Sequence, residues 1–379
     1  MLTPDQLPTP FFIVYEDRLR ANLSLITDVA RRSGAKIIMA FKANALWRTF
    51  PVIAEYCRDC TASSVNELRL GAECLGGEVH SYTPAYTDAN IDTFVGLSTH
   101  ITFNSLSQLA RFGDKARAAG VSVGLRVNPR CSVIETDLYN PALPGSRFGV
   151  GKEDLADGLP DGVEGLHFHA LCESTSYDLA KVLESFERDF GHLLPHLKWV
   201  NMGGGHLMTR QGYDTDHLVE VIRSFRKRHP GLEVILEPGS AFTWQTGDLV
   251  SSVVDVVEDR GIPTAILDVS FACHMPDTLE MPYTPAVAES VSEVQAPGQP
   301  EWRLGGNSCL SGDFKAGYWF ARPLRAGDRI TLRDMNHYTT VKTTMFNGVQ
   351  HPDIVFCHSD GSCEYLRRFD YEDYKNRMS

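Results

Sequence analysis

Short apolar runs alternate with amphipathic helical patterns over about the first two thirds of the chain. Eight of these runs predict buried strands, because they are brief, rich in β-branched residues and bounded by turn residues. The predicted strands cover residues 36–41, 61–64, 79–82, 101–103, 121–127, 163–169, 198–202 and 233–236. Helical spacing of apolar residues predicts helices between them, for example over 18–32, 65–75, 105–119, 177–190 and 216–228. The alternation favours an α/β fold with a parallel (β/α)8 barrel, and a doubly wound open sheet is the alternative.

The pattern changes after about residue 245, where helical periodicity fades and short β-type runs follow. These runs cover residues 249–257, 264–269, 302–304, 329–333 and 339–345, with Gly and Pro between them. They predict a mainly antiparallel β domain, which the extended segment 11–15 joins. We therefore expect a barrel domain over residues 20–245 and a β domain made of residues 1–19 and 246–379.

Charge and cysteine usage narrow the class of protein. The 379 residues carry a formal net charge of −12 without a basic run, which disfavours nucleic acid or membrane partners and suits a cationic small molecule. No apolar stretch approaches the roughly 18 residues that span a bilayer, and no signal-peptide pattern opens the chain, so we expect a cytoplasmic protein. Nine scattered cysteines indicate reduced thiols. Cys57 and Cys60 have no second pair at zinc-ligand spacing, so we expect no metal site.

Residues with chemical potential follow the ends of the predicted strands. In parallel barrels the ligand site lies at the carboxyl ends of the strands. At these ends stand Lys42 after the first strand, His169 in the sixth, Gly203, Gly204 and Gly205 after the seventh, and Glu237, Gly239 and Ser240 after the eighth. This alignment predicts one site at that end of the barrel.

Lys42 is the candidate nucleophile. Loss of hydration disfavours a charged amine, so a lysine directed out of a buried strand can be neutral and form a Schiff base with a carbonyl. The alternative is that Lys42 marks the solvated end of a strand.

The glycine run after the seventh strand is a candidate anion site. Without side chains, Gly203, Gly204 and Gly205 let backbone N–H groups approach a phosphate, and Gly239 and Ser240 offer further donors. The alternative is a glycine turn that binds no ligand.

His169 and Glu237 complete the predicted set. Alternation along a strand places His167 and His169 on one side, where His169 can stack on a flat ring or exchange protons, although a structural role is the alternative. Glu237 ends a buried run and needs a partner. It can hold a pyridine nitrogen protonated, which makes the ring an electron sink, or it can pair with Arg126.

Together these residues resemble the fold type III pyridoxal-phosphate-dependent decarboxylases of the alanine-racemase-like superfamily, over about residues 9–348. Ala40-Phe41-Lys42-Ala43-Asn44 is similar to the family's cofactor-lysine motif, and Glu237-Pro238-Gly239 to its glutamate motif. The resemblance implies pyridoxal 5'-phosphate as cofactor. It places the Schiff base on Lys42, the stacked ring on His169, the phosphate at Gly203 to Gly205 and the pyridine nitrogen at Glu237.

A second group of residues, beyond the barrel, resembles other family elements. Cys309 and Asp313 are similar to the family's C-x-x-x-D element, and Tyr338 to a tyrosine that reaches the phosphate. In the family, the cysteine comes from the partner subunit and protonates the product, and the aspartate contacts the distal amine. The resemblance thus implies a homodimer in which the β domain contributes to shared active sites.

Three separated segments, 138–147, 167–173 and 273–277, resemble the carboxynorspermidine (carboxyspermidine) decarboxylases of polyamine biosynthesis. The implied reaction is decarboxylation of carboxynorspermidine or carboxyspermidine to norspermidine or spermidine. Alternatives are a diaminopimelate, arginine or ornithine decarboxylase of the same fold, or a non-catalytic pyridoxal-phosphate-binding regulator. Ser240 departs from the arginine usual after the glutamate motif in ornithine and diaminopimelate enzymes.

A cationic substrate tail needs acidic partners, because an unpaired buried cation is costly. Salt bridges are the alternative for Asp277 and Glu173. The expected substrate-binding residues are Glu237, Asp268, His274, Asp277, Asp313 and Glu173.

Overall fold

The computed structural model describes residues 2–281 and 283–379. The chain forms two compact units, one of Arg20–Phe242 and one of Met1–Leu19 with Thr243–Ser379. None of the described helices is long and apolar enough to cross a membrane.

The first unit contains a parallel sheet of nine short strands in the order β2-β10-β9-β8-β7-β6-β5-β4-β3. Ile38 alone separates β2 from β3, and this segment bonds to both ends of the sheet. Ile38 N donates to Leu236 O at 2.9 Å, and Met39 N donates to Asp59 O at 3.0 Å. The expected parallel barrel is therefore confirmed. Its strands are β2 Lys36–Ile37, β3 Met39–Ala40, β4 Cys60–Ala62, β5 Val79–Tyr82, β6 His100–Phe103, β7 Ser122–Arg126, β8 Gly165–His167, β9 Trp199–Asn201 and β10 Glu233–Leu236.

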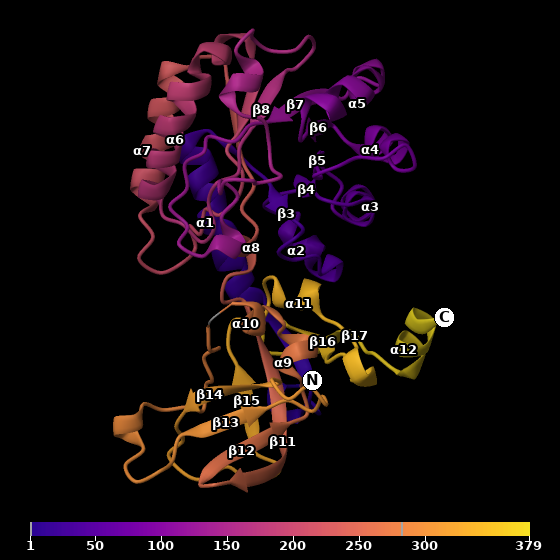
Figure 1. Ribbon diagram of the computed structural model, residues 1–379. Helices are drawn as coiled ribbons and strands as arrows, with labels where there is room; N and C mark the ends of the chain where they lie inside the picture. The colour runs from indigo at the N-terminus through magenta and orange to yellow at the C-terminus, as the bar shows by residue number, and fades with distance from the viewer. Residues whose placement is uncertain (1, 282) are drawn as a thin grey trace. The chain divides into compact units, whose positions relative to one another are not determined.

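Helices follow the strands and lie outside them (Figure 1). Polar residues start several of these helices: the hydroxyl of Ser64 accepts from Glu67 N, and that of Ser105 accepts from Gln108 N. Such caps satisfy amides that have no partner within the helix. The helices are α1 Glu16–Ser33, α2 Phe50–Ile53, α3 Val65–Cys74, α4 Ile91–Leu97, α5 Leu106–Ala118, α6 Ser176–Phe190, α7 Thr215–Arg228 and α8 Ser240–Thr243.

The second unit is built on a mixed, mostly antiparallel sheet, as expected. Its order is β14-β13-β12-β11-β1-β16-β17, and β15 also pairs with β11. The N-terminal strand β1 runs antiparallel to β11 and parallel to β16, so the extended opening of the chain joins this sheet. The strands are β1 Phe11–Tyr15, β11 Gly247–Asp259, β12 Ile262–Leu267, β13 Trp302–Gly305, β14 Phe314–Tyr318, β15 Arg329–Leu332, β16 Asp353–Cys357 and β17 Cys363–Arg367.

One strand prediction in this unit is wrong. Residues 339–345 contain the short helix α11, Thr339–Lys342, although the β-branched Thr-Thr-Val sequence favours a strand. The turn at Tyr338 and the hydrogen bond from Thr344 N to Cys273 O, at 2.7 Å, hold this segment outside the sheet. Tertiary contacts thus outweigh local propensity. The sequence patterns also missed β14, β16, β17, the short helices α9 Phe271–His274 and α10 Asp277–Glu280, and the C-terminal helix α12 Tyr371–Met378.

Candidate active site

The carboxyl ends of four barrel strands carry the predicted residues of the first unit. Lys42 follows β3, His169 follows β8, and Glu237 follows β10. Gly204, after β9, donates its amide to His169 Nδ1 at 2.9 Å, and Asn201 Nδ2 donates to Glu237 Oε1 at 2.6 Å. These bonds join the ends of β8, β9 and β10, so the alignment along the sequence becomes proximity in space.

Lys42 has the electrostatic environment of an amine that loses its proton readily. Its side chain remains accessible to solvent. The surrounding protein nevertheless displaces much of the hydrating water, and this desolvation lowers the pKa of Lys42. The charge of Glu237 opposes that shift, while the charge of Arg126 adds to it. The site thus combines an accessible amine with a bias toward its neutral, nucleophilic form.

Glu237 is a carboxylate held in its ionised form. Loss of hydration raises its pKa, but contacts from His167 and Asn201 outweigh that effect and keep the pKa of Glu237 below its ordinary value. His167 Nε2 lies 3.5 Å from Glu237 Oε2, which is longer than a good hydrogen bond. Burial in turn lowers the pKa of His167, and Glu237 opposes this shift. Asn201 is therefore the principal hydrogen-bond donor to the carboxylate.

Arg126 does not provide the ion pair that was the alternative for Glu237. Its guanidinium donates to the backbone oxygen of His169 at 3.2 Å. It also stacks on the rings of Tyr82 and Phe148, with distances of 4.7 and 4.4 Å to the ring centroids. Arg126 is buried, and it supports the β8 loop through these contacts.

Sequence reasoning missed Asn201 and did not assign His167 a partner. The signal for Asn201 is a polar residue inside an apolar strand, because a buried amide needs hydrogen-bond partners. Its Nδ2 group serves Glu237, and its Oδ1 accepts from Gly203 N at 2.9 Å. One side chain thus couples the glutamate to the glycine loop.

The glycines after β9 and β10 are required by close backbone approach. Gly203 and Gly205 have φ angles of 72° and 87°, which side chains disfavour. A Cβ atom on Gly204 would lie 2.5 Å from the backbone oxygen of Glu237, and one on Gly239 would lie 2.5 Å from Ala43 Cβ. Because the amides of Gly203 and Gly204 already bond to Asn201 and His169, only part of the run is available to an anion.

In the second unit, Asp313 organises the loop that carries Cys309. Asp313 is 4% exposed. Its carboxylate accepts from Ala272 N at 2.9 Å, from Ser308 N at 3.2 Å and from the Ser308 hydroxyl at 2.6 Å. The neighbouring Cys309 is exposed, and its amide donates to Asn347 Oδ1 at 2.8 Å. This loop presents a thiol to solvent on a hydrogen-bonded backbone.

The other two acidic candidates of this unit, Asp268 and Asp277, differ in how many hydrogen bonds their carboxylate oxygens already accept. Asp268 accepts from the hydroxyls of Thr9 and Ser251, at 2.6 Å each, and from Ser252 N at 2.9 Å. Asp277 Oδ2 accepts from the Tyr283 hydroxyl at 2.6 Å, whereas the buried Oδ1 has no hydrogen-bond partner among the described residues. Asp277 therefore retains an acceptor for a cation, while Asp268 stabilises the sheet.

His274, Tyr338 and Glu173 occupy distinct settings. His274 is fully buried, its Nδ1 accepts from Ser270 N at 3.1 Å, and burial lowers its pKa to about 3. Tyr338 has a φ angle of 52°, an unusual conformation for an aromatic residue. Such strain is found most often at functional loops. Glu173 is exposed and belongs to the first unit, with a φ angle of 47°.

These residues fit pyridoxal phosphate. The fit rests on a desolvated lysine, a carboxylate that stays ionised, and a glycine cradle that side chains would fill. A protonated ring nitrogen needs such a carboxylate, and a Schiff base needs such an amine.

Known proteins of similar sequence agree with this fit. The family model described as pyridoxal-dependent decarboxylase, C-terminal sheet domain, matches residues 12–336. A carboxyaminopropylagmatine decarboxylase from Synechocystis sp. is 47% identical over 98% of this chain and 96% of that protein. A carboxynorspermidine/carboxyspermidine decarboxylase from Campylobacter jejuni is 39% identical over 98% of this chain and 99% of that protein.

A solved structure agrees as well. The crystal structure of carboxynorspermidine decarboxylase from Campylobacter jejuni, complexed with norspermidine, has a TM-score of 0.90 and 38% identity. The similarity covers 98% of this chain and 100% of that one. The expected resemblance to fold type III decarboxylases is thereby confirmed, and the chain belongs to the pyridoxal-dependent decarboxylase family.

Proposed function

We propose that this enzyme decarboxylates carboxynorspermidine and carboxyspermidine and releases norspermidine or spermidine. The main support is its similarity, at 39% identity over nearly the full length, to the Campylobacter jejuni enzyme named for these substrates. Both substrates join an α-amino acid to a cationic polyamine tail. A net charge of −12 favours the approach of such a cation.

Four side chains of the barrel carry the cofactor chemistry in this proposal. Pyridoxal phosphate, when bound, supplies an electron-poor ring that accepts the electron pair released as carbon dioxide leaves. Lys42 provides the amine that holds the cofactor, and its lowered pKa favours the reactive form. Glu237 keeps a proton on the ring nitrogen while Asn201 fixes the carboxylate. His169, oriented by the amide of Gly204, packs against the ring.

The phosphate group requires donors that are not already engaged. The amides of Gly203 and Gly204 already donate hydrogen bonds to Asn201 and His169, so we assign the phosphate to other donors. These are the amide of Gly205 and the Gly239–Ser240 turn that opens α8. Tyr338 stays a further phosphate candidate through its resemblance to the family tyrosine.

Cys309 is the proton donor to the product carbon in this proposal, and it acts as Cys309 of the partner subunit in a homodimer with shared sites. An exposed thiol on a hydrogen-bonded loop suits this role, because the donor must reach a substrate outside its own unit. Asp313 positions that loop through Ser308.

For the distal amine we favour Asp277 over Asp268 and Asp313, because three donors already bond to the Asp313 carboxylate. A carboxylate with a buried oxygen that lacks a donor gains most from a cationic amine, and Asp277 Oδ1 is such an oxygen. The three donors on Asp268 already satisfy that group. His274 and Glu173 remain the other predicted substrate-binding residues.

Carboxyaminopropylagmatine is the second candidate substrate, because the Synechocystis sp. relative that carries its name is 47% identical to this chain. That substrate ends in a guanidinium group where the carboxytriamines end in an ammonium group. A planar guanidinium prefers a carboxylate with two accessible oxygens. Among the described residues, nothing donates a hydrogen bond to Asp277 Oδ1, and this single available oxygen favours the ammonium substrates.

Carbon dioxide release from the purified holoenzyme tests both candidates. The panel contains carboxynorspermidine, carboxyspermidine, carboxyaminopropylagmatine, diaminopimelate, arginine and ornithine. We expect kcat/KM for the carboxytriamines to exceed that for the guanidinium substrate by about tenfold or more, since a buried polar group left without its partner costs about 1–3 kcal/mol. Preference for carboxyaminopropylagmatine would establish the second candidate. Turnover of diaminopimelate or a basic amino acid alone would refute both.

A further inference from the structure

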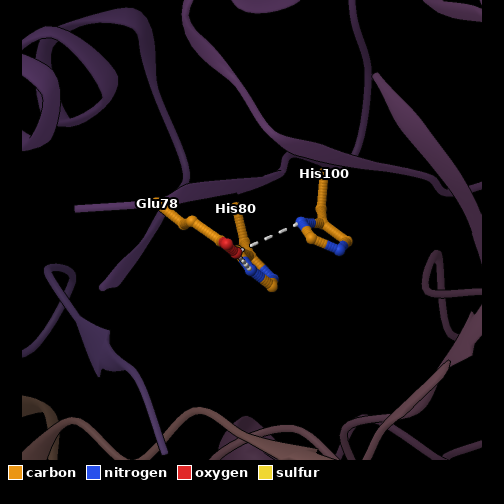
Figure 2. A group of neighbouring side chains, drawn as sticks. All are labelled: Glu78, His80 and His100. Carbon is orange, nitrogen blue, oxygen red and sulfur yellow. Dashed lines mark ion pairs between the residues drawn. The ribbon is translucent and has the colours of Figure 1, made fainter. Parts of the chain in front are cut away.

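A second group of metal-ligating side chains lies at the amino end of the barrel strands. His80 is the second residue of β5, His100 is the first residue of β6, and Glu78 precedes β5. The parallel register pairs His80 with His100, so the two imidazoles project side by side from neighbouring strands. Figure 2 shows the Glu78 carboxylate facing both rings. Lys42 and Glu237 follow the opposite, carboxyl ends of their strands.

The distances are close to those of a coordination site. His80 Nε2 and His100 Nδ1 lie 3.5 and 3.9 Å from Glu78 Oε2. One ligand atom from each residue lies within 4.8 Å of the other two. Zinc bonds of about 2.0–2.1 Å in tetrahedral geometry place donors about 3.3 Å apart. Coordination therefore requires a modest contraction and a tilt of the two rings, which now stack with centroids 4.0 Å apart at 18°.

His80 supplies an independent reason for a ligand. Its side chain is 5% exposed, and its Nε2 atom makes no hydrogen bond of good geometry with the described residues, since the Glu78 carboxylate lies 3.5 Å away. A buried nitrogen without a partner is costly, and a metal ion would satisfy it. His100 Nδ1 contacts the Thr99 hydroxyl at 3.1 Å, and that hydroxyl also donates to Val79 O at 3.3 Å. Thr99 therefore keeps an acceptor when the imidazole turns to a metal.

We propose that Glu78, His80 and His100 bind one divalent transition-metal ion, such as Zn²⁺, with water in the remaining position. Two imidazoles and one carboxylate form a common zinc ligand set. The ion would tie the start of β5 to the start of β6. Its ligands stand at the opposite ends of the strands from Lys42 and Glu237, so its expected effect is on the stability of the barrel.

Lys36 competes with the metal ion for the Glu78 carboxylate. Its ammonium group pairs with the Glu78 carboxylate and lies 3.3 Å from Asp59 Oδ2. A bound cation displaces the ammonium from Glu78, and Asp59 retains it. Removing the lysine charge should consequently tighten metal binding, a direction that a purely structural ion-pair network does not predict.

The experiment is titration of tag-free holoenzyme with Zn²⁺ and with Co²⁺, followed by calorimetry, visible absorption and thermal melting. We expect one equivalent to bind, Tm to rise, and Co²⁺ to show ligand-field bands without a thiolate charge-transfer band. His80→Gln and His100→Gln should each weaken binding more than about tenfold, whereas Lys36→Gln should strengthen it.

The matched control is a double variant of the exposed histidines His192→Gln and His196→Gln, which should bind the metal like the parent. Melting of each variant without metal confirms that it is folded, and Glu78→Gln provides a third ligand variant if either histidine variant is not. The proposal is overturned by the absence of one-to-one binding, by unchanged affinity in the folded ligand variants, or by a thiolate band, which would assign the metal to cysteines.

Discussion

The two ends of the barrel both concentrate charged and imidazole side chains, but they treat charge differently. At the carboxyl end, Lys42 is desolvated without a direct ion pair among the described residues, and Glu237 is held ionised by His167 and Asn201. At the amino end, Lys36 pairs directly with Glu78 and Asp59. The polar contacts of Lys36 and Glu78 keep both groups charged, because they raise the pKa of Lys36 and lower that of Glu78 to about 2. Desolvation without an ion pair instead lowers the pKa of Lys42 and favours its neutral, reactive form. We therefore propose that the carboxyl end carries the chemistry and that the amino end stabilises the barrel.

The strongest test of this comparison replaces each of the two lysines by alanine in a separate variant. Lys42→Ala should reduce turnover by more than about 1,000-fold and remove the visible absorption of the bound cofactor, because no other amine replaces it. The matched variant Lys36→Ala should keep both, since that amine serves an ion pair. Absorption spectra and carbon dioxide release measure the effects. Equal loss of turnover in the two variants would break the distinction between the ends.

Cys309 extends the comparison to the second unit. Cys309→Ala should lower turnover about 100- to 10,000-fold while the cofactor spectrum stays intact, as expected for loss of a general acid. Mixing this variant with Lys42→Ala should restore about a quarter of the parent activity, because half of randomly formed dimers are hybrids with one intact site of two. Failure of the mixture to recover activity, with exchange of subunits verified, would contradict a shared site.

The two carboxylates provide a second matched pair. Glu237→Gln should reduce turnover about 100-fold, because an amide cannot hold the ring nitrogen protonated. Glu78→Gln should leave turnover unchanged and lower the free energy of unfolding by about 1 kcal/mol or less, since its ion pair is partly exposed. Kinetics and chemical denaturation measure the pair. An inactive but folded Glu78→Gln variant would show that the amino end takes part in chemistry.

An effect on stability alone is expected from His206, which follows the glycine loop. Burial lowers its pKa to about 4 from an ordinary 6.5. The unfolded chain therefore binds this proton at a higher pH than the folded chain does, so stability falls as the pH drops from 6.5 toward 4. His206→Gln should flatten the dependence of Tm on pH in this range. The pH-dependent part of the free energy of unfolding that it removes is on the order of 3 kcal/mol at most. An unchanged slope would indicate that another group governs the acid sensitivity.

Lys42 and the neighbouring candidates could be predicted because a parallel barrel places the carboxyl ends of its strands at one rim. Runs 79–82 and 233–236 coincide with β5 and β10 in the structure. The assignment of the chain to its family also followed from motifs, since Lys42 and Glu237 stand in characteristic local sequences. The residue roles rest on those motifs and stay predictions.

The partners of these residues required the tertiary structure. Glu237 bonds to Asn201, which lies 36 positions earlier, and no ion pair to Arg126 occurs in the described parts of the chain. Likewise His80 and His100 meet only because the register of β5 and β6 aligns them. Secondary structure also depends on tertiary contacts in residues 339–345, since Thr339–Lys342 is helical despite its β-branched sequence.

The sequence alone determined the alternation of strands and helices, the end of the barrel that carries Lys42, and the family. Local spacing is sufficient for these because hydrophobic periodicity and short motifs act over a few residues. Only the tertiary structure decided which donors hold Glu237, which glycine amides remain available, and which side chains meet at the amino end. Those contacts join residues distant along the chain, and their geometry depends on how the sheet closes at Ile38, between Leu236 and Asp59.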